Sequence, residues 1–352
     1  MKLHYRSLIT VSILALSLVS CDRDKSDSSD PGDAEIPEIP VSEIYVSGYE
    51  SGDAKYWKNG TVTNLTSASS SGGYATGITV AGNDVYVAGW DDIPGGRKLQ
   101  YWKNGVPTQL AVGDHNTLTG GIAVSGNDVY VTGAQTDSNG TKVGKCWKNG
   151  VATNLSDGTP GHHTNAGGIV VVGNDVYIAG GEFNGSRGVA KYWKNGVAVP
   201  LTDGTKSAHA YAIAVDGSDI YVAGYEAKTT DGGSLPIAKY WKNGVAVSLT
   251  DGANYNIATD IAILGKNVYV CGYQNNGSTG NTAKYWKNGV ARDLTNGSQG
   301  GSQANAIALS GGAVYIAGYE GNFVTYWKNG VATHLSNGGS SSSSGLAIFL
   351  KK

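Results

Sequence analysis

Charged residues are scarce in this chain, and the scarcity narrows the possible folds. Only 15% of the 352 residues are charged, against about 25% in an ordinary soluble domain, while 53 residues are glycine. This composition argues against a helical bundle, and because the glycines do not recur at every third position, it also excludes a collagen-like helix. The part of the chain beyond residue 43 is close to electrically neutral, so we expect no attraction to nucleic acid.

The N-terminal region has the pattern of an exported protein. A short basic stretch precedes an apolar run over residues 7–20. This run is shorter than a typical transmembrane helix and is typical of a secretory signal. The run ends in Leu18-Val19-Ser20-Cys21, which resembles the lipobox of bacterial lipoprotein signals. The resemblance implies removal of residues 1–20 and attachment of a lipid to Cys21. We therefore expect a lipid-anchored protein of the bacterial cell envelope, at the outer membrane, on its periplasmic or its outer side.

Residues 21–43 are polar and acidic, with eight acidic residues against two basic ones. Such a composition does not bury enough apolar surface to fold, so it predicts a flexible tether between the anchor and the rest of the chain.

Internal repetition is the strongest feature of residues 44–352. The sequence Tyr-Trp-Lys-Asn-Gly, or a near copy, occurs seven times with spacings of 41 to 48 residues, and a Val-Tyr-Val-Ala-Gly type segment precedes each copy. About 44 residues per unit is the length of a four-stranded propeller blade. In the fifth unit we expect strands over 210–215, 219–225, 237–242 and 245–249, with a long loop before residue 236. Asn-Gly is the preferred pair for a two-residue hairpin turn because both of its positions take positive φ.

The two ends of the chain complement each other. The first unit begins at the second strand of a blade, and the missing first strand occurs only at the C-terminus, over 345–349. The sequence therefore predicts a single all-β domain, a closed ring of seven four-stranded blades without unpaired edges. It resembles the broad class of secreted seven-bladed β-propellers, although it lacks the Gly-His and Trp-Asp signature of WD-repeat propellers. Cys146 and Cys271 fall in blades three and six, too far apart for a disulfide.

Residues that recur in every unit are expected to serve the fold. We predict that the seven repeated tryptophans pack in the core, and that a ring of lysines on the face with the tight turns is partly neutralised by aspartates. On the opposite face, which we call the top, acidic residues are expected to pair with lysines across each hairpin. Trp90 is the eighth tryptophan and lies outside the repeat, which makes it a candidate for ligand contact.

Departures from the repeat are the candidates for function. Before the isoleucine of the first strand, six units carry a small residue (Gly77, Gly121, Gly168, Ala212, Ala306 and Gly345), whereas the sixth carries Asp260. Other candidate ligand-binding residues in or beside the equivalent loops are Tyr74, His115, His162, His163, Asn165, His209, Tyr211, Tyr255 and Asn305. We expect these to surround the mouth of the central channel on the top face.

Metal sites and catalytic motifs find little support in the sequence. The adjacent residues His162 and His163 would point in opposite directions on an extended chain, and no regular ligand spacing accompanies them. The chain has no Gly-x-Ser-x-Gly elbow, no phosphate loop and no Ser-x-Asp-x-Gly-x-x-Trp box of the sialidase-like propellers. Asp260 and His209 are the one acid–base pair that could be proposed.

Three functional hypotheses follow, and none requires a cofactor or a metal. The preferred one is an envelope-anchored binding or scaffolding protein, held to the membrane through Cys21, that contacts a glycan or a protein through its top face. The first alternative is an extracytoplasmic polysaccharide lyase or hydrolase at the channel mouth around Asp260, His209 and Tyr211. The second is a purely structural envelope protein.

Overall fold

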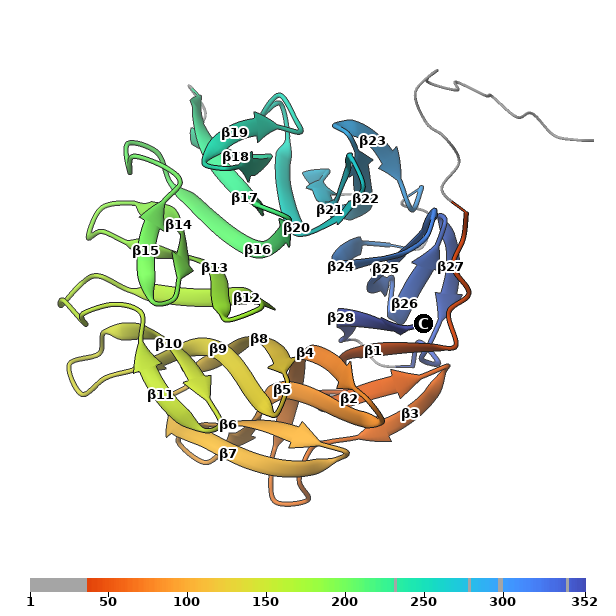
Figure 1. Ribbon diagram of the computed structural model, residues 1–352, viewed down its shortest axis with the longest axis horizontal. Helices are drawn as coiled ribbons and strands as arrows, with labels where there is room; N and C mark the ends of the chain where they lie inside the picture. Colours follow the sequence, from red (N-terminus) through yellow and green to blue (C-terminus); the bar gives the residue numbers. More distant parts are fainter. Residues whose placement is uncertain (1–36, 231–232, 278–279, 297–299, 340–341) are drawn as a thin grey trace, which may run out of the picture. The chain divides into compact units, whose positions relative to one another are not determined.

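Each repeated unit folds as a four-stranded antiparallel sheet, and seven such sheets surround one axis (Figure 1). The computed structural model describes residues 37–352 except 231–232, 278–279, 297–299 and 340–341. The expected signal sequence, Cys21 and the greater part of the expected tether lie outside the described residues. The expected all-β ring of seven blades is confirmed.

The blades are numbered in chain order, and their strands are given from the axis outward. Blade 1 is β28 (Ser343–Lys351), β1 (Glu43–Glu50), β2 (Asp53–Lys58) and β3 (Thr61–Asn64); blade 2 is β4 (Gly72–Ala81), β5 (Asp84–Ile93), β6 (Gly96–Lys103) and β7 (Val106–Gly113); blade 3 is β8 (Leu118–Ser125), β9 (Asp128–Thr136), β10 (Lys142–Lys148) and β11 (Val151–Asn154); blade 4 is β12 (Thr164–Val172), β13 (Asp175–Phe183), β14 (Gly188–Lys194) and β15 (Val197–Pro200). Blade 5 is β16 (Ala208–Asp216), β17 (Asp219–Thr230), β18 (Gly233–Lys242) and β19 (Val245–Ser248); blade 6 is β20 (Tyr255–Leu264), β21 (Asn267–Asn275), β22 (Asn281–Lys287) and β23 (Val290–Asp293); blade 7 is β24 (Ser302–Ser310), β25 (Ala313–Glu320), β26 (Phe323–Lys328) and β27 (Val331–His334).

Closure of the ring joins the two ends of the chain in blade 1. β28 pairs antiparallel with β1, with Val46 opposite Ile348 and Glu50 opposite Ser343. The C-terminal strand therefore supplies the inner strand that the first unit lacks, as the sequence predicts. Because every blade now has four strands and two neighbours, the ring closes without a gap between the first and last units.

The Asn-Gly pairs form the outer hairpin turns of all seven blades. Their asparagines have φ of 49–52° and their glycines 82–84°, as a type I′ turn requires. Each asparagine side chain also accepts a hydrogen bond from the first residues of the second strand, for example from Val85 N to Asn104 Oδ1 at 2.8 Å. Asparagine is therefore favoured at this position by its backbone conformation and by its side-chain hydrogen bond to the second strand of the same blade.

The seven repeated tryptophans form the packing between blades, as expected. All are at most 1% exposed: Trp57, Trp102, Trp147, Trp193, Trp241, Trp286 and Trp327. Trp193 of blade 4 donates from Nε1 to the Leu155 carbonyl of blade 3 at 2.9 Å, and Trp286 of blade 6 packs on Tyr221 of blade 5. Cys271 is buried and Cys146 half-buried, and both are free thiols.

The lysines of the bottom face, the face with the tight turns, are neutralised. Lys103, Lys148, Lys194 and Lys242 pair with aspartates at 2.7–2.9 Å, and Lys58 pairs with Glu43. All seven lysines of the ring also lie over a tyrosine ring of the same blade, 5.1–5.9 Å from its centre. The predicted neutralisation is confirmed, and the described pairs leave little free positive charge on this face.

One expectation about the top face is wrong. The long loop expected before residue 236 is instead an extended ribbon, in which β17 and β18 remain paired as far as Thr230 and Gly233. In blades 1 and 7 the second and third strands are likewise joined by only two residues, 51–52 and 321–322. The strands stay paired up to these short turns because each further pair satisfies backbone groups.

The segment before β1 packs on the bottom of blade 7 (Figure 1). The Pro37 carbonyl accepts a hydrogen bond from Gly312 N at 3.3 Å, the Ile39 carbonyl accepts one from Ser310 Oγ at 2.9 Å, and Glu38 pairs with Lys328. A Cβ on Gly311 would lie 2.0 Å from the Pro37 carbonyl oxygen, so only glycine fits beneath this segment. The chain therefore enters the propeller from its bottom face.

Removal of residues 343–352 should open the ring, because β1 loses its inner partner and the blade 1–blade 7 contact loses β28. We expect the melting temperature, followed by far-ultraviolet circular dichroism, to fall by at least about 10 °C, with oligomers visible by size-exclusion chromatography. Removal of Lys352 alone is the control and should change neither measurement. A monomeric, equally stable truncated protein would contradict closure by β28.

Candidate functional site

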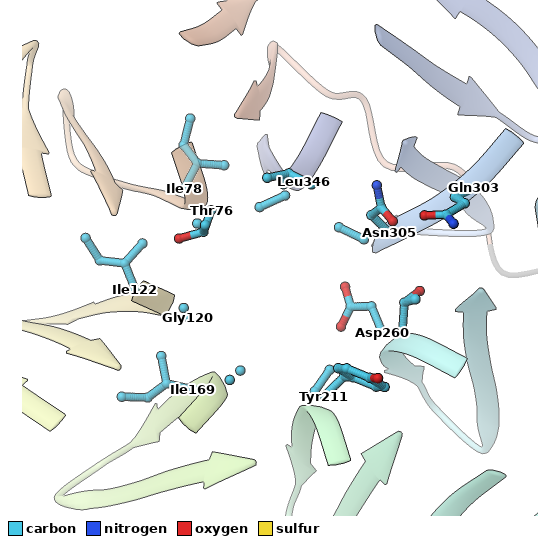
Figure 2. Close-up of a pocket in the computed structure, with 18 of the residues that line it drawn as sticks. Thr76, Ile78, Gly120, Ile122, Ile169, Tyr211, Asp260, Gln303, Asn305 and Leu346 are labelled. Carbon is cyan, nitrogen blue, oxygen red and sulfur yellow. The ribbon is translucent and has the colours of Figure 1, made fainter. Parts of the chain in front are cut away.

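A cavity of about 480 Å³ lies on the axis, where the inner strands meet (Figure 2). Blades 1 to 4 line it mainly with isoleucine, leucine, alanine and glycine, and Thr76 is their one hydroxyl. Blades 5 to 7 contribute most of the polar groups: Tyr211, Thr259, Asp260, Tyr273, Gln303 and Asn305. The near-symmetric ring therefore encloses a cavity that is apolar on one side and polar on the other.

A β-bulge in every inner strand creates this lining. In β16, Ala210 pairs with Gly224 and Ala212 with Ala223, so the intervening Tyr211 has no partner across the sheet. The corresponding unpaired residues that line the cavity are Thr76, Gly120, Gly167, Tyr211, Thr259, Asn305 and Leu346. Bulges re-aim side chains in this way, and the period-two strand pattern of the sequence does not reveal them.

The bulges also explain the glycine of the Val-Tyr-Val-Ala-Gly segment. A Cβ on this glycine, for example Gly89 or Gly224, would lie about 2.0 Å from a carbonyl oxygen of the inner strand. The same register corrects one alignment made from the sequence. Ala347 occupies the position of Asp260 in blade 1, whereas Gly345 aligns with Ala75, two residues earlier.

Glycine lines the cavity in blades 3 and 4 because their inner strands approach closely. A Cβ on Gly120 would lie 2.4 Å from the Ala166 carbonyl oxygen, and one on Gly168 would lie 2.9 Å from Ala212 Cα. A side chain is therefore excluded at these two glycine positions. The polar groups that line the cavity lie mainly on the opposite side, in blades 5 to 7.

Asp260 joins blade 6 to blade 7. Its Oδ1 accepts a hydrogen bond from Ile261 N and its Oδ2 accepts one from Ile307 N of the next blade, both at 2.8 Å. Burial raises the pKa of this carboxyl group from 3.8 to about 7, although the two N–H groups act in the opposite direction. Both carboxyl oxygens are thus engaged with the backbone, at the wall of the cavity (Figure 2).

His209 does not form an acid–base pair with Asp260 in the described residues. Its ring lies against Gly181 of blade 4, where a Cβ would be 3.0 Å from the imidazole, and stacks obliquely on Tyr211 at 4.7 Å. Its Nδ1 is buried without a hydrogen-bond partner. Burial lowers the pKa of His209 to about 4, so the ring is neutral at physiological pH.

Seven tyrosines in blades 5, 6, 7, 1 and 2 lie near one another, and two of them, Tyr211 and Tyr273, line the cavity. We call the following residues the tyrosine arc: Tyr211, Tyr225, Tyr255, Tyr273, Tyr319, Tyr49 and Tyr74. Burial raises the pKa of Tyr273 to about 12, and the nearby hydroxyls of Tyr255, Tyr319 and Tyr225 add to the rise. Tyr211 and Tyr255 are the most exposed members, at 37% and 42%.

Four members of the arc were not among the candidates from the sequence. Tyr225, Tyr273, Tyr319 and Tyr49 follow the repeated glycine of the second strand, where blades 3 and 4 carry Ala134 and Gly181. Comparison of the units at this position reveals the difference, because the repeat holds tyrosine in four consecutive blades and small residues in two. Trp90 occupies the same position in blade 2, so the one candidate from this strand position was the residue that differs from the repeated tyrosine.

Trp90 is not an open contact surface. It is 9% exposed, stacks on Tyr74 at 5.1 Å, and carries the Arg97 guanidinium group 4.6 Å from its ring centre. Tyr74 in turn lies 4.3 Å from Tyr49. The indole therefore supports the end of the tyrosine arc from beneath.

The other candidates lie at separate places on the top face. His162 faces Glu182 at 3.4 Å, and His163 Nδ1 accepts a hydrogen bond from Lys142 N at 3.0 Å. Asn165 has a buried Oδ1 without a partner, and Asn305 donates from Nδ2 to Ser344 Oγ and the Gly345 carbonyl, both at 2.8 Å. Of the candidates from the sequence, Tyr211, Asp260 and Asn305 line the cavity, and Tyr74 and Tyr255 belong to the arc.

The acidic ring of the top face is largely paired. Lys55, Lys191 and Lys239 bind Glu50, Glu182 and Glu226 of the same hairpins at 2.5–2.9 Å. Blade 2 differs, since Asp91 pairs with Lys98 at 3.4 Å and not with the buried Gln100. In blade 6, Lys284 pairs with Asp293 and not with Gln274.

Within the described part of the chain, no three His, Cys, Asp or Glu side chains are grouped so that they could hold a metal ion. The same residues include no helix with the length and apolar character to cross a membrane.

The comparisons with known proteins concern the fold alone. No protein-family model and no curated protein matches the chain. Among solved structures, TolB from Acinetobacter baumannii is similar, with 12% sequence identity and a TM-score of 0.48. The match covers 74% of this chain and 65% of the TolB chain, so this chain spans less than two thirds of that protein. The function is therefore argued from the site itself.

The raised pKa of Asp260 predicts a pH-dependent contribution to stability. Between about pH 4 and 7 the folded protein retains a proton that the unfolded chain has lost, so this contribution decreases as the pH rises and levels off above about 7. Relative to wild type, Asp260→Asn should become steadily more stable over that range, measured as the difference in melting temperature. Asp84→Asn is the control: Lys103 lowers the pKa of the Asp84 carboxyl group, so this variant should not become more stable relative to wild type over the same range. A difference that is constant with pH would contradict the assignment.

Proposed function

We propose that this protein is a binding or scaffolding module of the bacterial cell envelope, which contacts a glycan or a protein through its top face. One observation carries the proposal: the tyrosine arc adjoins the polar side of the cavity through Tyr211 and Tyr273, which line it together with Gln303 and Asn305. Tyrosine supplies flat contact area at low cost in conformational entropy, and adjacent amides and hydroxyls add hydrogen bonds. Such a combination is typical of a recognition surface.

The raised pKa of Asp260 is the observation that favours the alternative, a polysaccharide hydrolase or lyase. A general acid must reach the substrate with its proton, however, and both Asp260 oxygens already accept backbone hydrogen bonds. His209, the partner that the sequence offered, faces blade 4 and packs on Gly181. The geometry therefore favours a structural role for Asp260 and supports binding over catalysis.

The direction of chain entry supports the envelope proposal. The segment over residues 37–42 reaches the ring along the bottom of blade 7. The described chain thus joins the propeller at its bottom face, and the tyrosine arc lies on the other face.

A test of the binding face compares two variants of the full-length protein. Immobilised protein is exposed to an envelope extract of the producing bacterium, and retained sugar and retained protein are measured separately. We expect the double variant Tyr211→Ala, Tyr273→Ala to retain at least tenfold less material than wild type, since each ring contributes about 1 kcal/mol or more to such a contact.

The matched control carries two substitutions on the bottom face, Lys103→Ala and Lys148→Ala, and should retain as much as wild type. Equal retention by the arc variant would contradict a site on the top face. New reducing ends or unsaturated sugars in the extract after contact with wild type would instead support the enzyme. Absence of any retention would leave the purely structural alternative.

The proposed anchor predicts that Cys21→Ser abolishes metabolic labelling with radioactive palmitate. The variant should also move out of the detergent-soluble membrane fraction, because Cys21 is the only residue to which the lipobox resemblance assigns a lipid. Cys146→Ser keeps the same number of cysteines as this variant and should remain labelled and membrane-bound. Continued labelling of Cys21→Ser would contradict the assignment.

A further inference from the structure

We infer that the ligand of the tyrosine arc is a neutral polysaccharide. This inference rests on the proposed function and names the chemical class that the same surface recognises. Three observations carry it: the continuity of the aromatic rings, the kind of polar groups beside them, and the pairing of the charges around them.

The rings of the arc lie near one another in neighbouring blades. The ring centres of Tyr211 and Tyr225 are 6.2 Å apart, and the nearby hydroxyls of Tyr225, Tyr273 and Tyr255 add to the effect of burial in raising the pKa of Tyr211. The row continues through Tyr319 and Tyr49 to Tyr74, whose ring is 4.3 Å from that of Tyr49. The arc therefore crosses five consecutive blades and offers several stacking positions to one extended chain. The apolar faces of successive sugar rings can stack on such a row, as other flat rings do.

The polar groups beside the row are uncharged donors and acceptors. Gln303, Asn305 and Thr259 line the cavity, and Tyr319 hydrogen-bonds Asn281. Asn305 and Thr259 donate to groups of the protein, so toward a ligand they offer their oxygen atoms as acceptors. Amides and hydroxyls both donate and accept, so they match sugar hydroxyl groups, which do the same. A lysine or an arginine, which only donates, does not line the cavity within the described residues.

Three ion pairs lie at the border of the arc, whereas Glu320, beside Tyr319, has Thr325 in its hairpin at the position of the pairing lysine. Lys239 binds Glu226 at 2.5 Å beside Tyr225, Lys55 binds Glu50 at 2.9 Å beside Tyr49, and Arg97 binds Asp92 at 3.1 Å beyond Trp90. An acidic polysaccharide would have to break such pairs to be neutralised, and it would also meet the Asp260 carboxyl group. A neutral chain meets no such cost.

A protein partner is less compatible with this surface. A stable protein interface needs about 800 Å² on each side with a close-packed apolar centre. Here the centre of the arc is the cavity, and the rings lie around part of its rim. A narrow flexible chain can follow such a rim, whereas a rigid protein surface would span the opening without filling it.

The experiment measures binding of the full-length protein in a sugar-free detergent to two sets of soluble polysaccharides. The neutral set is β-glucan, mannan and xylan, and the acidic set is alginate, polygalacturonate and chondroitin sulfate. We expect at least one neutral polymer to bind at least tenfold more tightly than any acidic one. The affinity should change less than about twofold between about 50 and about 500 mM salt, because no ion pair forms on binding.

Single substitutions locate the contact. Tyr273→Ala should weaken binding about fivefold, since one ring contributes about 1 kcal/mol, whereas Tyr273→Phe keeps the ring and should stay within about twofold of wild type. Phe183→Ala is the matched control, since Phe183 is 39% exposed at the top of blade 4, outside the arc. It should bind as wild type does. Unchanged circular dichroism and melting temperature in the three variants separate loss of contact from loss of fold.

Other results would overturn the inference in distinguishable ways. Preference for the acidic set, a steep salt dependence, or full binding by Tyr273→Ala would each reject a neutral glycan on the arc. If no polysaccharide binds but retention of envelope protein still depends on Tyr211 and Tyr273, the inference fails and the proposed function stands. If neither sugar nor protein is retained through the arc, both fail.

Discussion

Pairing of β1 with β28 is the interaction on which the rest of the structure depends. It joins residues about 300 positions apart, from Glu43 opposite Lys351 to Glu50 opposite Ser343. Without it, blade 1 would have no inner strand and the sheet edges at the first and last blades would be open to other chains. With it, seven inner strands meet at one axis, and the cavity between them has a complete wall. The binding surface is therefore a property of the closed ring and of no single blade.

Residues that recur in every unit stabilise the ring, and residues that differ between units line the cavity on its axis. The repeated tryptophan packs between blades, the Asn-Gly pair makes the outer turn, and the repeated lysine lies over a tyrosine beside its acidic partner. The repeated glycine makes room for the bulge of the inner strand, because a Cβ there would meet a carbonyl oxygen. These packing requirements do not fix the residue at the bulge itself, so its side chain can differ from blade to blade. Blades 3 and 4 use glycine there, and blades 5 to 7 use Tyr211, Thr259 and Asn305.

Asp260 shows that the role inferred for a residue from the sequence can differ from its role in the structure. A lone carboxyl group at a position of small residues was the sharpest exception in the repeat, and a catalytic or ligand-binding role was a reasonable hypothesis. In the folded protein its two oxygens bridge Ile261 and Ile307, on inner strands of adjacent blades. Asp260 therefore stabilises the junction of blades 6 and 7, at the polar side of the cavity.

The sequence by itself determined the class of fold, the number of blades, the buried tryptophans and the closure by the C-terminal strand. These follow from local rules repeated seven times: strand alternation, turn residues that tolerate positive φ, and a unit of about 44 residues. Only the tertiary structure decided which of the residues that depart from the repeat lie close together. The bulges turn side chains toward the axis, but the alternation of apolar and polar residues along the strands does not reveal them. The burial of Trp90 and the contact of His209 with Gly181 depend on neighbouring blades. The tyrosine arc likewise exists only because closure brings blades 5, 6, 7, 1 and 2 side by side, across the point where the chain begins and ends.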